Sequence, residues 1–166
     1  GFIGCGKIAR VRHIPEASRM DGVHISGYYN RTREKAEDMA KIYGGQVYNT
    51  YQEVLDDPEV DAVVISVANI LHREITIEAL KKGKHVLCEK SIASNQYEFE
   101  QMQKDALKNR KVLLEAMRSV YSPGFVAIRE NLSKLGTIRR ASFQYCQYFR
   151  IRRMSISITE MEEWNI

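Results

Sequence analysis

The chain has 166 residues, 44% of them hydrophobic, which is enough to bury the core of one good-sized domain but not of two large ones. The net charge of +4 comes from lysines and arginines spread along the chain, which argues against nucleic-acid binding. No apolar run approaches the roughly 18 residues of a membrane helix, and we see no signal peptide. Three cysteines without a C-x-x-C pair favour a cytoplasmic protein with no disulfide framework and no metal site.

Segments typical of strands and segments typical of helices alternate along most of the chain. The predicted strands cover residues 2–3, 23–30, 46–49, 60–67, 84–89 and 111–117. The run VDAVVISV at 60–67 is almost continuously apolar and β-branched, as in a strand that is buried on both faces of a parallel sheet. Helices are predicted between or after the strands, at residues 32–44, 71–83, 95–109 and 122–136. The alternation predicts an α/β domain whose parallel strands are joined by right-handed crossovers.

Two of these helices have recognisable first residues. Asn95 is followed three positions later by Glu98, which is the spacing of a capping box. Ser122 is a suitable N-cap with Pro123 at the first helical position, and Gly136 provides the stop.

The pattern changes after residue 136. Residues 137–149 alternate between apolar and polar side chains, with Ala141, Phe143 and Tyr145 on one face, which predicts a half-exposed strand of an open sheet. We interpret it as the first strand of a second, α+β domain. We therefore expect a nucleotide-binding domain at 1–120, a linking helix and strand at 121–149, and an atypical tail at 150–166. An exposed strand at 141–149 invites pairing with another copy, so a homo-oligomer is expected.

The stretch GCGKIA, Gly4 to Ala9, matches the pattern G-x-G-x-x-A between a short strand and a predicted helix. In a dinucleotide-binding turn the first glycine permits the tight turn, the second lets the backbone approach a pyrophosphate, and the small third residue lets helix and strand pack closely. The free N–H groups of the following helix then face the phosphates. The residues predicted to line this turn are Gly4, Cys5, Gly6, Lys7 and Ile8. The alternatives are a glycine-rich turn without a ligand and an S-adenosylmethionine site.

The second predicted strand ends at Asn30-Arg31-Thr32-Arg33. A site selective for NAD usually has an acidic residue here for the ribose 2′-hydroxyl, whereas an arginine suits a 2′-phosphate. Asn30 and Arg31 therefore favour NADP, with NAD as the alternative. Arg31 and Arg33 could also be solvated charges at the start of a helix.

Four further stretches, VDAVVISVANILH, ALKKGKHVLCEKS, LLEAMRSVYSP and NLSKLGTIRRASF, together with GCGKIA, make a family recognisable. In order from Gly1 to about Tyr148, the chain resembles the glucose–fructose oxidoreductase, inositol dehydrogenase and MocA-like (Gfo/Idh/MocA) family. The resemblance implies a doubly wound, mostly parallel Rossmann sheet. It also implies an NAD(P)-dependent oxidoreductase that acts on a sugar, polyol or diol.

The resemblance also implies roles for particular residues. The family's E-K-P motif corresponds to Glu89-Lys90-Ser91, so Lys90 would lie beside the nicotinamide and the reacting hydroxyl, with Glu89 orienting it. The T-P-N-x-x-H motif corresponds to a segment in which Asn69 and His72 match. Cofactor contacts are expected from both motifs and from a position after the sixth strand: Val67, Ala68, Asn69, His72, Glu89, Lys90 and Arg118.

The chain departs from the family pattern in three places. Ala68 and Ser91 replace prolines that would stiffen the loops at the nicotinamide end. From Arg150 onward nothing resembles the family, so the substrate domain with its acid–base residues is not recognisable. A reading-frame slip near Phe149 and a partial record of a longer chain are both open explanations. A non-catalytic dinucleotide-binding module is therefore the alternative to an enzyme.

Overall fold

The computed structural model describes residues 1–142 and 144. The chain divides into two compact units, the first comprising Gly1–Val126 and the second beginning at Ala127. The first unit holds the whole sheet. Helix α6 (Pro123–Asn131) crosses the boundary and is followed by the 3₁₀ helix η4 (Leu132–Leu135), which ends at Gly136 as expected.

Six parallel strands form one sheet in the order β3-β2-β1-β4-β5-β6. Their bounds are β1 Phe2–Ile3, β2 Gly27–Tyr29, β3 Gln46–Val47, β4 Ala62–Ile65, β5 His85–Cys88 and β6 Leu113–Glu115. This is the doubly wound Rossmann arrangement, so the predicted fold class is confirmed. Each predicted strand is present, and five of the six are shorter than expected.

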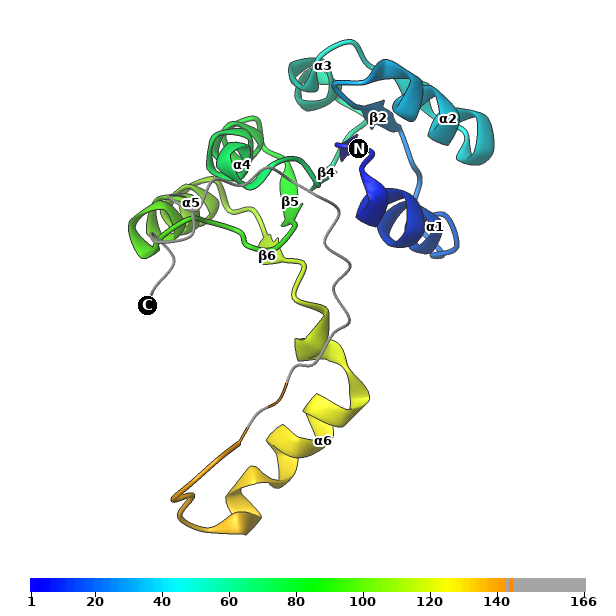
Figure 1. Ribbon diagram of the computed structural model, residues 1–166. Coiled ribbons are helices and arrows are strands. Elements are labelled where there is room, and N and C mark those ends of the chain that lie inside the picture. Colours follow the sequence, from blue (N-terminus) through cyan, green and yellow to red (C-terminus); the bar gives the residue numbers. More distant parts are fainter. Residues whose placement is uncertain (143, 145–166) are drawn as a thin grey trace, which may run out of the picture. The chain divides into compact units, whose positions relative to one another are not determined.

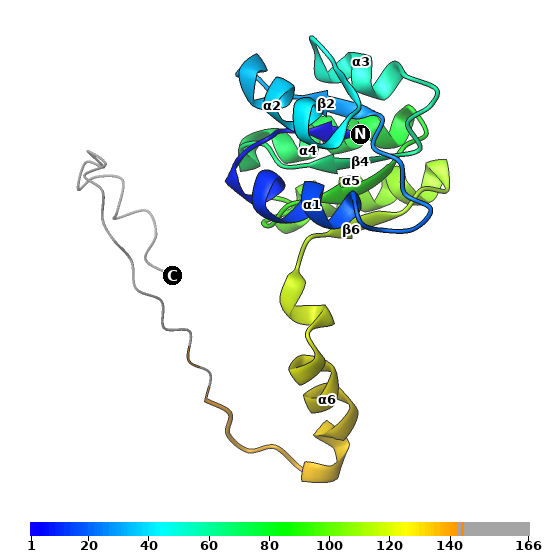
Figure 2. The same ribbon diagram turned by 90° about the vertical axis from the view of Figure 1, so that its right-hand side faces the viewer.

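The helices connect these strands and lie on both sides of the sheet. They are the π-helical turn η1 (Ala9–His13), α1 (Ile14–Ala17), α2 (Arg33–Tyr43), α3 (Tyr51–Asp56), η2 (Asn69–Leu71), α4 (His72–Lys81), α5 (Gln96–Asn109) and η3 (Arg118–Tyr121). Helix α1 lies on one side of the strands, while α4 and α5 lie on the other (Figure 1, Figure 2). Asn95 caps α5 as predicted, because its Oδ1 accepts the Glu98 N–H at 2.9 Å.

The core has two layers, one on each face of the sheet. Phe2 belongs to the layer beneath α1 and α2, and its neighbour Ile3 belongs to the layer beneath α3, α4 and α5. Successive side chains of a strand point to opposite faces. Both faces of the sheet are buried, and for this reason the strands contain continuous apolar runs rather than alternating apolar and polar residues.

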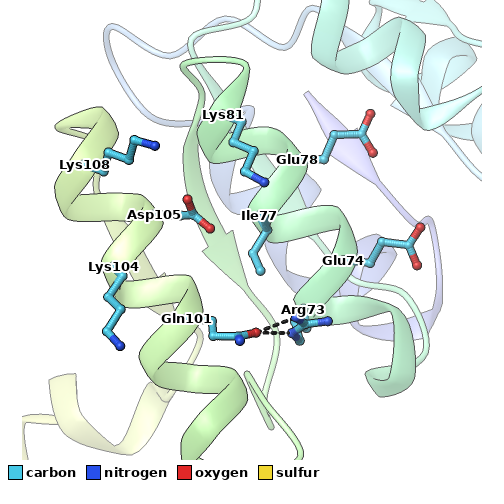
Figure 3. Close-up of a pocket in the computed structure, with 9 residues that line it drawn as sticks. All are labelled: Arg73, Glu74, Ile77, Glu78, Lys81, Gln101, Lys104, Asp105 and Lys108. Carbon is cyan, nitrogen blue, oxygen red and sulfur yellow. Dashed lines mark hydrogen bonds between the residues drawn. The ribbon is translucent and has the colours of Figure 1, made fainter.

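Helices α4 and α5 pack side by side, and Arg73 Nε donates to Gln101 Oε1 at 2.9 Å between them (Figure 3). A surface hollow of about 700 Å³ lies along the two helices. Its lining residues are Arg73, Glu74, Ile77, Glu78, Lys81, Gln101, Lys104, Asp105 and Lys108. None of the predicted site residues lines this hollow.

The strand expected at 137–149 is not formed by its described part. Residues 137–142 and 144 belong to no strand. The other residues of that segment, and the tail at 150–166, lie outside the described residues. The predicted pairing through 141–149 therefore stays a prediction.

Candidate cofactor-binding site

The loops after β1, β4 and β5 meet at one edge of the sheet. The three strands are adjacent and parallel, so their carboxyl ends lie together. The chain runs outward in one direction from β1 through β2 and in the other through β4, which makes the gap between β1 and β4 the switch point. Open α/β sheets bind ligands at such a point.

Gly4 is the tightest position of the turn after β1. Its φ is +100°, and a Cβ built on it would lie 2.3 Å from the Ser66 carbonyl oxygen of the β4 loop. Its N–H donates to the Tyr29 carbonyl at 2.8 Å. Both the backbone angle and the close approach exclude a side chain here, which is the role predicted for the first glycine.

Gly6 has the opposite surroundings. A Cβ at Gly6 would meet no atom within 4 Å, so this glycine is not required by the packing of the protein itself. Helical backbone begins at Lys7, and the Arg10 N–H donates to the Gly6 carbonyl at 3.1 Å. The N–H groups of the first turn therefore lack helical acceptors. An open glycine beside free N–H groups fits a dinucleotide pyrophosphate.

Asn30 holds the turn from the end of β2. Its Oδ1 accepts the Cys5 N–H at 2.8 Å, and its Nδ2 donates to the Thr32 carbonyl at 2.8 Å. Asn30 therefore supports the glycine turn with both ends of its amide. The Cys5 thiol is fully buried, and this burial raises its pKa to about 11. A thiol that is protonated at neutral pH is a poor nucleophile.

We expect Asn30→Ala to lower the free energy of unfolding by about 1–3 kcal/mol, because the Cys5 N–H would lose its acceptor. Urea denaturation of the two proteins measures this difference. Asn30→Asp is the matched control, since its carboxylate keeps an oxygen for the Cys5 N–H. Equal stability of Asn30→Ala and the parent would contradict the supporting role.

The two arginines after β2 differ in their surroundings. The Arg33 guanidinium donates to Glu37 Oε1 at 2.9 Å and to Asn49. Arg31 is exposed and forms no hydrogen bond or ion pair with any described residue. Of these two cations, Arg31 is the one whose donors are available to a ligand.

Glu89 directly follows β5 and joins it to the π-helical turn η1. Its N–H donates to the Ile65 carbonyl at 2.9 Å, which extends the pairing of β5 with β4. One carboxylate oxygen lies 2.7 Å from His13 Nε2, and the other accepts the Lys90 N–H at 3.1 Å. Nothing in the glycine motif pointed to His13, because its partner lies 76 residues further along the chain.

The backbone of the segment that follows Lys90 forms hydrogen bonds with side chains of two other elements, α4 and β6. His72 is completely buried, with Nδ1 2.8 Å from the Ser91 carbonyl and Nε2 3.2 Å from the Val67 carbonyl. Glu115 of β6, another residue that sequence reasoning missed, accepts the Ile92 N–H at 2.9 Å. The Lys90–Ser91 peptide bond is cis. His72 thus ties the β4 and β5 loops together, and its predicted contact with the cofactor stays a prediction.

Four predicted residues besides Arg31 have side-chain polar groups that are free of hydrogen bonds and ion pairs with the described residues. The side chains of Lys7, Asn69, Lys90 and Arg118 are exposed and form no hydrogen bond or ion pair within residues 1–142 and 144. Across the same residues no three His, Cys, Asp or Glu side chains are arranged to hold a metal ion. None of the helices described is both long enough and apolar enough to cross a membrane.

A model of the Gfo/Idh/MocA oxidoreductase family, described as having an NAD-binding Rossmann fold, matches residues 1–117. The chain belongs to this family. The predicted recognition is therefore confirmed, and the sheet with its glycine turn is the family's NAD-binding domain.

Several Gfo/Idh/MocA relatives are similar over most of the chain. A scyllo-inositol 2-dehydrogenase (NADP(+)) of Bacillus subtilis is 38% identical over 138 residues, which are 82% of this chain and 42% of the relative. A trans-1,2-dihydrobenzene-1,2-diol dehydrogenase of Xenopus laevis is 33% identical over 118 residues, which are 68% of this chain and 36% of the relative. The chain thus spans about two fifths of the length of these proteins.

A solved structure of a relative is also similar to this chain. The 3-ketoreductase KijD10 of Actinomadura kijaniata, solved in complex with NADP and TDP-benzene, has a TM-score of 0.76 and 27% identity. The similarity covers 81% of this chain and 41% of KijD10. The fold of the first unit is therefore shared with a family member that was solved with a nicotinamide cofactor.

Proposed function

We propose that this domain binds NADP, and that the protein transfers a hydride between the nicotinamide and a carbon that bears a hydroxyl group in a polyol, sugar or diol. The observation that carries the proposal is the shared edge of the sheet. There the open Gly6 and the free N–H groups of the first helical turn lie at the same edge as Lys90, whose ammonium forms no hydrogen bond or ion pair with any described residue.

The nicotinamide, when bound, supplies the hydride acceptor or donor. Lys90 would hydrogen-bond the oxygen of the reacting carbon through its ammonium group. Negative charge grows on that oxygen when a hydride is added to the carbonyl carbon, or, in the direction of oxidation, when the hydroxyl proton leaves to solvent before the hydride departs. A cation fixed beside the oxygen stabilises this charge in both directions. Glu89 would keep the backbone of Lys90 in place through its contact with the Lys90 N–H.

The substrate class rests on the relatives. The names of two of them specify scyllo-inositol and a dihydrobenzene diol, and both compounds carry hydroxyl groups on neighbouring carbons of a ring. A hydroxyl-bearing ring is therefore the first substrate to test. The preference for NADP rests on Arg31, whose donors are available to a 2′-phosphate.

We expect Arg31→Ala to weaken NADPH binding by about ten- to a hundredfold, because a charged donor to the 2′-phosphate is lost. NADH lacks this phosphate, so its affinity is expected to stay within about twofold. Fluorescence titration with each cofactor measures both dissociation constants. Arg33→Ala is the matched control, since Glu37 and Asn49 already occupy its guanidinium. Equal weakening of NADPH and NADH would contradict a 2′-phosphate contact.

The proposed function is tested in two steps. Titration with NADPH and NADH decides whether the domain binds a nicotinamide cofactor, and binding of neither contradicts the proposal. The oxidation of scyllo-inositol and of other polyols, sugars and diols with NADP then decides whether the protein is an enzyme. A protein that binds NADPH and turns over no polyol, sugar or diol would instead be a non-catalytic dinucleotide-binding module.

Two further properties belong to the proposal. A cytoplasmic location is supported by the odd number of cysteines and the lack of a C-x-x-C pair. Self-association is supported by the alternating pattern of residues 137–149, which favours pairing between strand edges.

A further inference from the structure

The contact between His13 and Glu89 links two parts of the site that are far apart in sequence. His13 is the last residue of the π-helical turn that follows the glycine turn. Its Nε2 lies 2.7 Å from Glu89 Oε1, and the two side chains are only 18% and 13% exposed. The end of the π-helical turn that follows the glycine turn is thereby fixed to the loop after β5, which contains Lys90.

Glu89 depends on this contact because little water reaches its carboxylate. A carboxylate at low exposure needs a donor for each oxygen. One oxygen takes the N–H of the next residue, Lys90, and the other takes His13. Removing His13 would leave one oxygen without a protein donor, so the carboxylate would turn toward water and release the Lys90 N–H.

The backbone around His13 supplies an independent observation. Residues 9–13 form a π-helical turn between helical segments of other types. A π turn widens a helix locally, is rare, and occurs mostly at functional positions. Here it ends at His13, whose side chain contacts Glu89 in the loop after β5.

We propose that His13 is a positioning residue for Lys90, acting through the Glu89 carboxylate. It does not touch the substrate. It holds the carboxylate that fixes the Lys90 backbone, and so sets where the Lys90 ammonium can reach. This inference rests on the proposed function for its effect on turnover, whereas its effect on the Lys90 backbone does not depend on any reaction.

The test uses two His13 variants in the full chain. His13→Gln keeps an N–H donor that corresponds in position to Nε2, and His13→Leu removes it at similar size. His24→Leu is the control, since His24 is exposed and forms no hydrogen bond or ion pair with any described residue. The measured quantities are kcat and KM with NADP and scyllo-inositol, the NADPH dissociation constant, and the exchange rate of the Lys90 amide hydrogen.

We expect His13→Leu to lower kcat by about ten- to a hundredfold, as for a reacting group that is slightly misplaced, while KM for NADP and NADPH affinity change by less than about twofold. The Lys90 amide should exchange about tenfold faster, because its acceptor has been released. His13→Gln should restore kcat and exchange to within about threefold of the parent. His24→Leu should match the parent in every measurement.

Three results would overturn the inference. One is unchanged kcat and unchanged Lys90 exchange in His13→Leu. Another is a loss of NADPH affinity as large as the loss of kcat, which would indicate a general disturbance of the fold. The third is no rescue by His13→Gln. If the parent itself turns over no substrate, the proposed function fails. The Lys90 exchange rates then decide the inference alone, with faster exchange in His13→Leu and rescue by His13→Gln supporting it.

Discussion

Replacing Lys90 by methionine is expected to lower kcat by about 10²- to 10³-fold, because the substrate oxygen loses the cation that stabilises its developing charge. Methionine keeps the length of the side chain and removes only the ammonium group. The dissociation constant for NADPH should stay within about twofold, since Lys90 is proposed to bind the substrate oxygen and not the pyrophosphate. Oxidation of scyllo-inositol by NADP and a fluorescence titration measure the two quantities.

Lys104→Met controls for the loss of one surface charge. Lys104 lies on α5 and lines the hollow between α4 and α5 (Figure 3), where no predicted site residue is found. The kcat of Lys104→Met should equal that of the parent protein. Turnover of Lys90→Met at the rate of the parent would contradict the role proposed for Lys90. A parallel loss of NADPH affinity would point to a binding role instead.

Replacing each of the two glycines of the turn by alanine is expected to affect a different property, the stability at Gly4 and the binding of NADPH at Gly6. Gly4→Ala should lower the free energy of unfolding by about 3 kcal/mol or more, because its Cβ would overlap the Ser66 carbonyl at a φ that only glycine adopts easily. Gly6→Ala should leave the unfolding free energy within about 1 kcal/mol, since its Cβ enters open space. It should nevertheless weaken NADPH binding about tenfold or more, because in a dinucleotide-binding turn the second glycine lets the pyrophosphate approach the backbone.

Urea denaturation and NADPH titration of both variants separate these effects. Gly22→Ala is the control for a positive φ alone, as its φ is +77° and a Cβ there meets nothing within 4 Å. It should cost only about 1–2 kcal/mol. If Gly6→Ala bound NADPH as tightly as the parent, the pyrophosphate would not lie against the turn. If Gly4→Ala were as stable as the parent, the crowding at Ser66 would have no energetic consequence.

Most of the fold could be predicted because its signals are local. The run at 60–67 became β4, and Asn95 and Glu98 formed the cap that their spacing predicted. Helix α3 was missed because six residues are too short to display a helical period, although Thr50 caps it by accepting the Glu53 N–H at 3.2 Å. The strand predicted at 23–30 is only three residues long, since β2 is paired with β1 and β3 over Gly27–Tyr29 alone.

By itself the sequence determined the order of strands and helices, the glycine turn and the motif that contains Lys90. These follow from residues that are close together in the chain. The tertiary structure decided which polar groups remain available to a ligand. Arg31 and Arg33 look alike in sequence, but Arg33 is engaged by Glu37 and Asn49.

The same holds for the contacts that support the site. Asn30 accepts a hydrogen bond from the Cys5 N–H, 25 residues away in the sequence. Glu89 contacts His13, which is 76 residues away. No local pattern encodes such pairs, because they form only when the loops after β1, β2 and β5 are brought together by the sheet. Hydrogen-bond partners in this site are set by the packing of distant segments, whereas the strands and turns that carry them are set by the neighbouring residues in the chain.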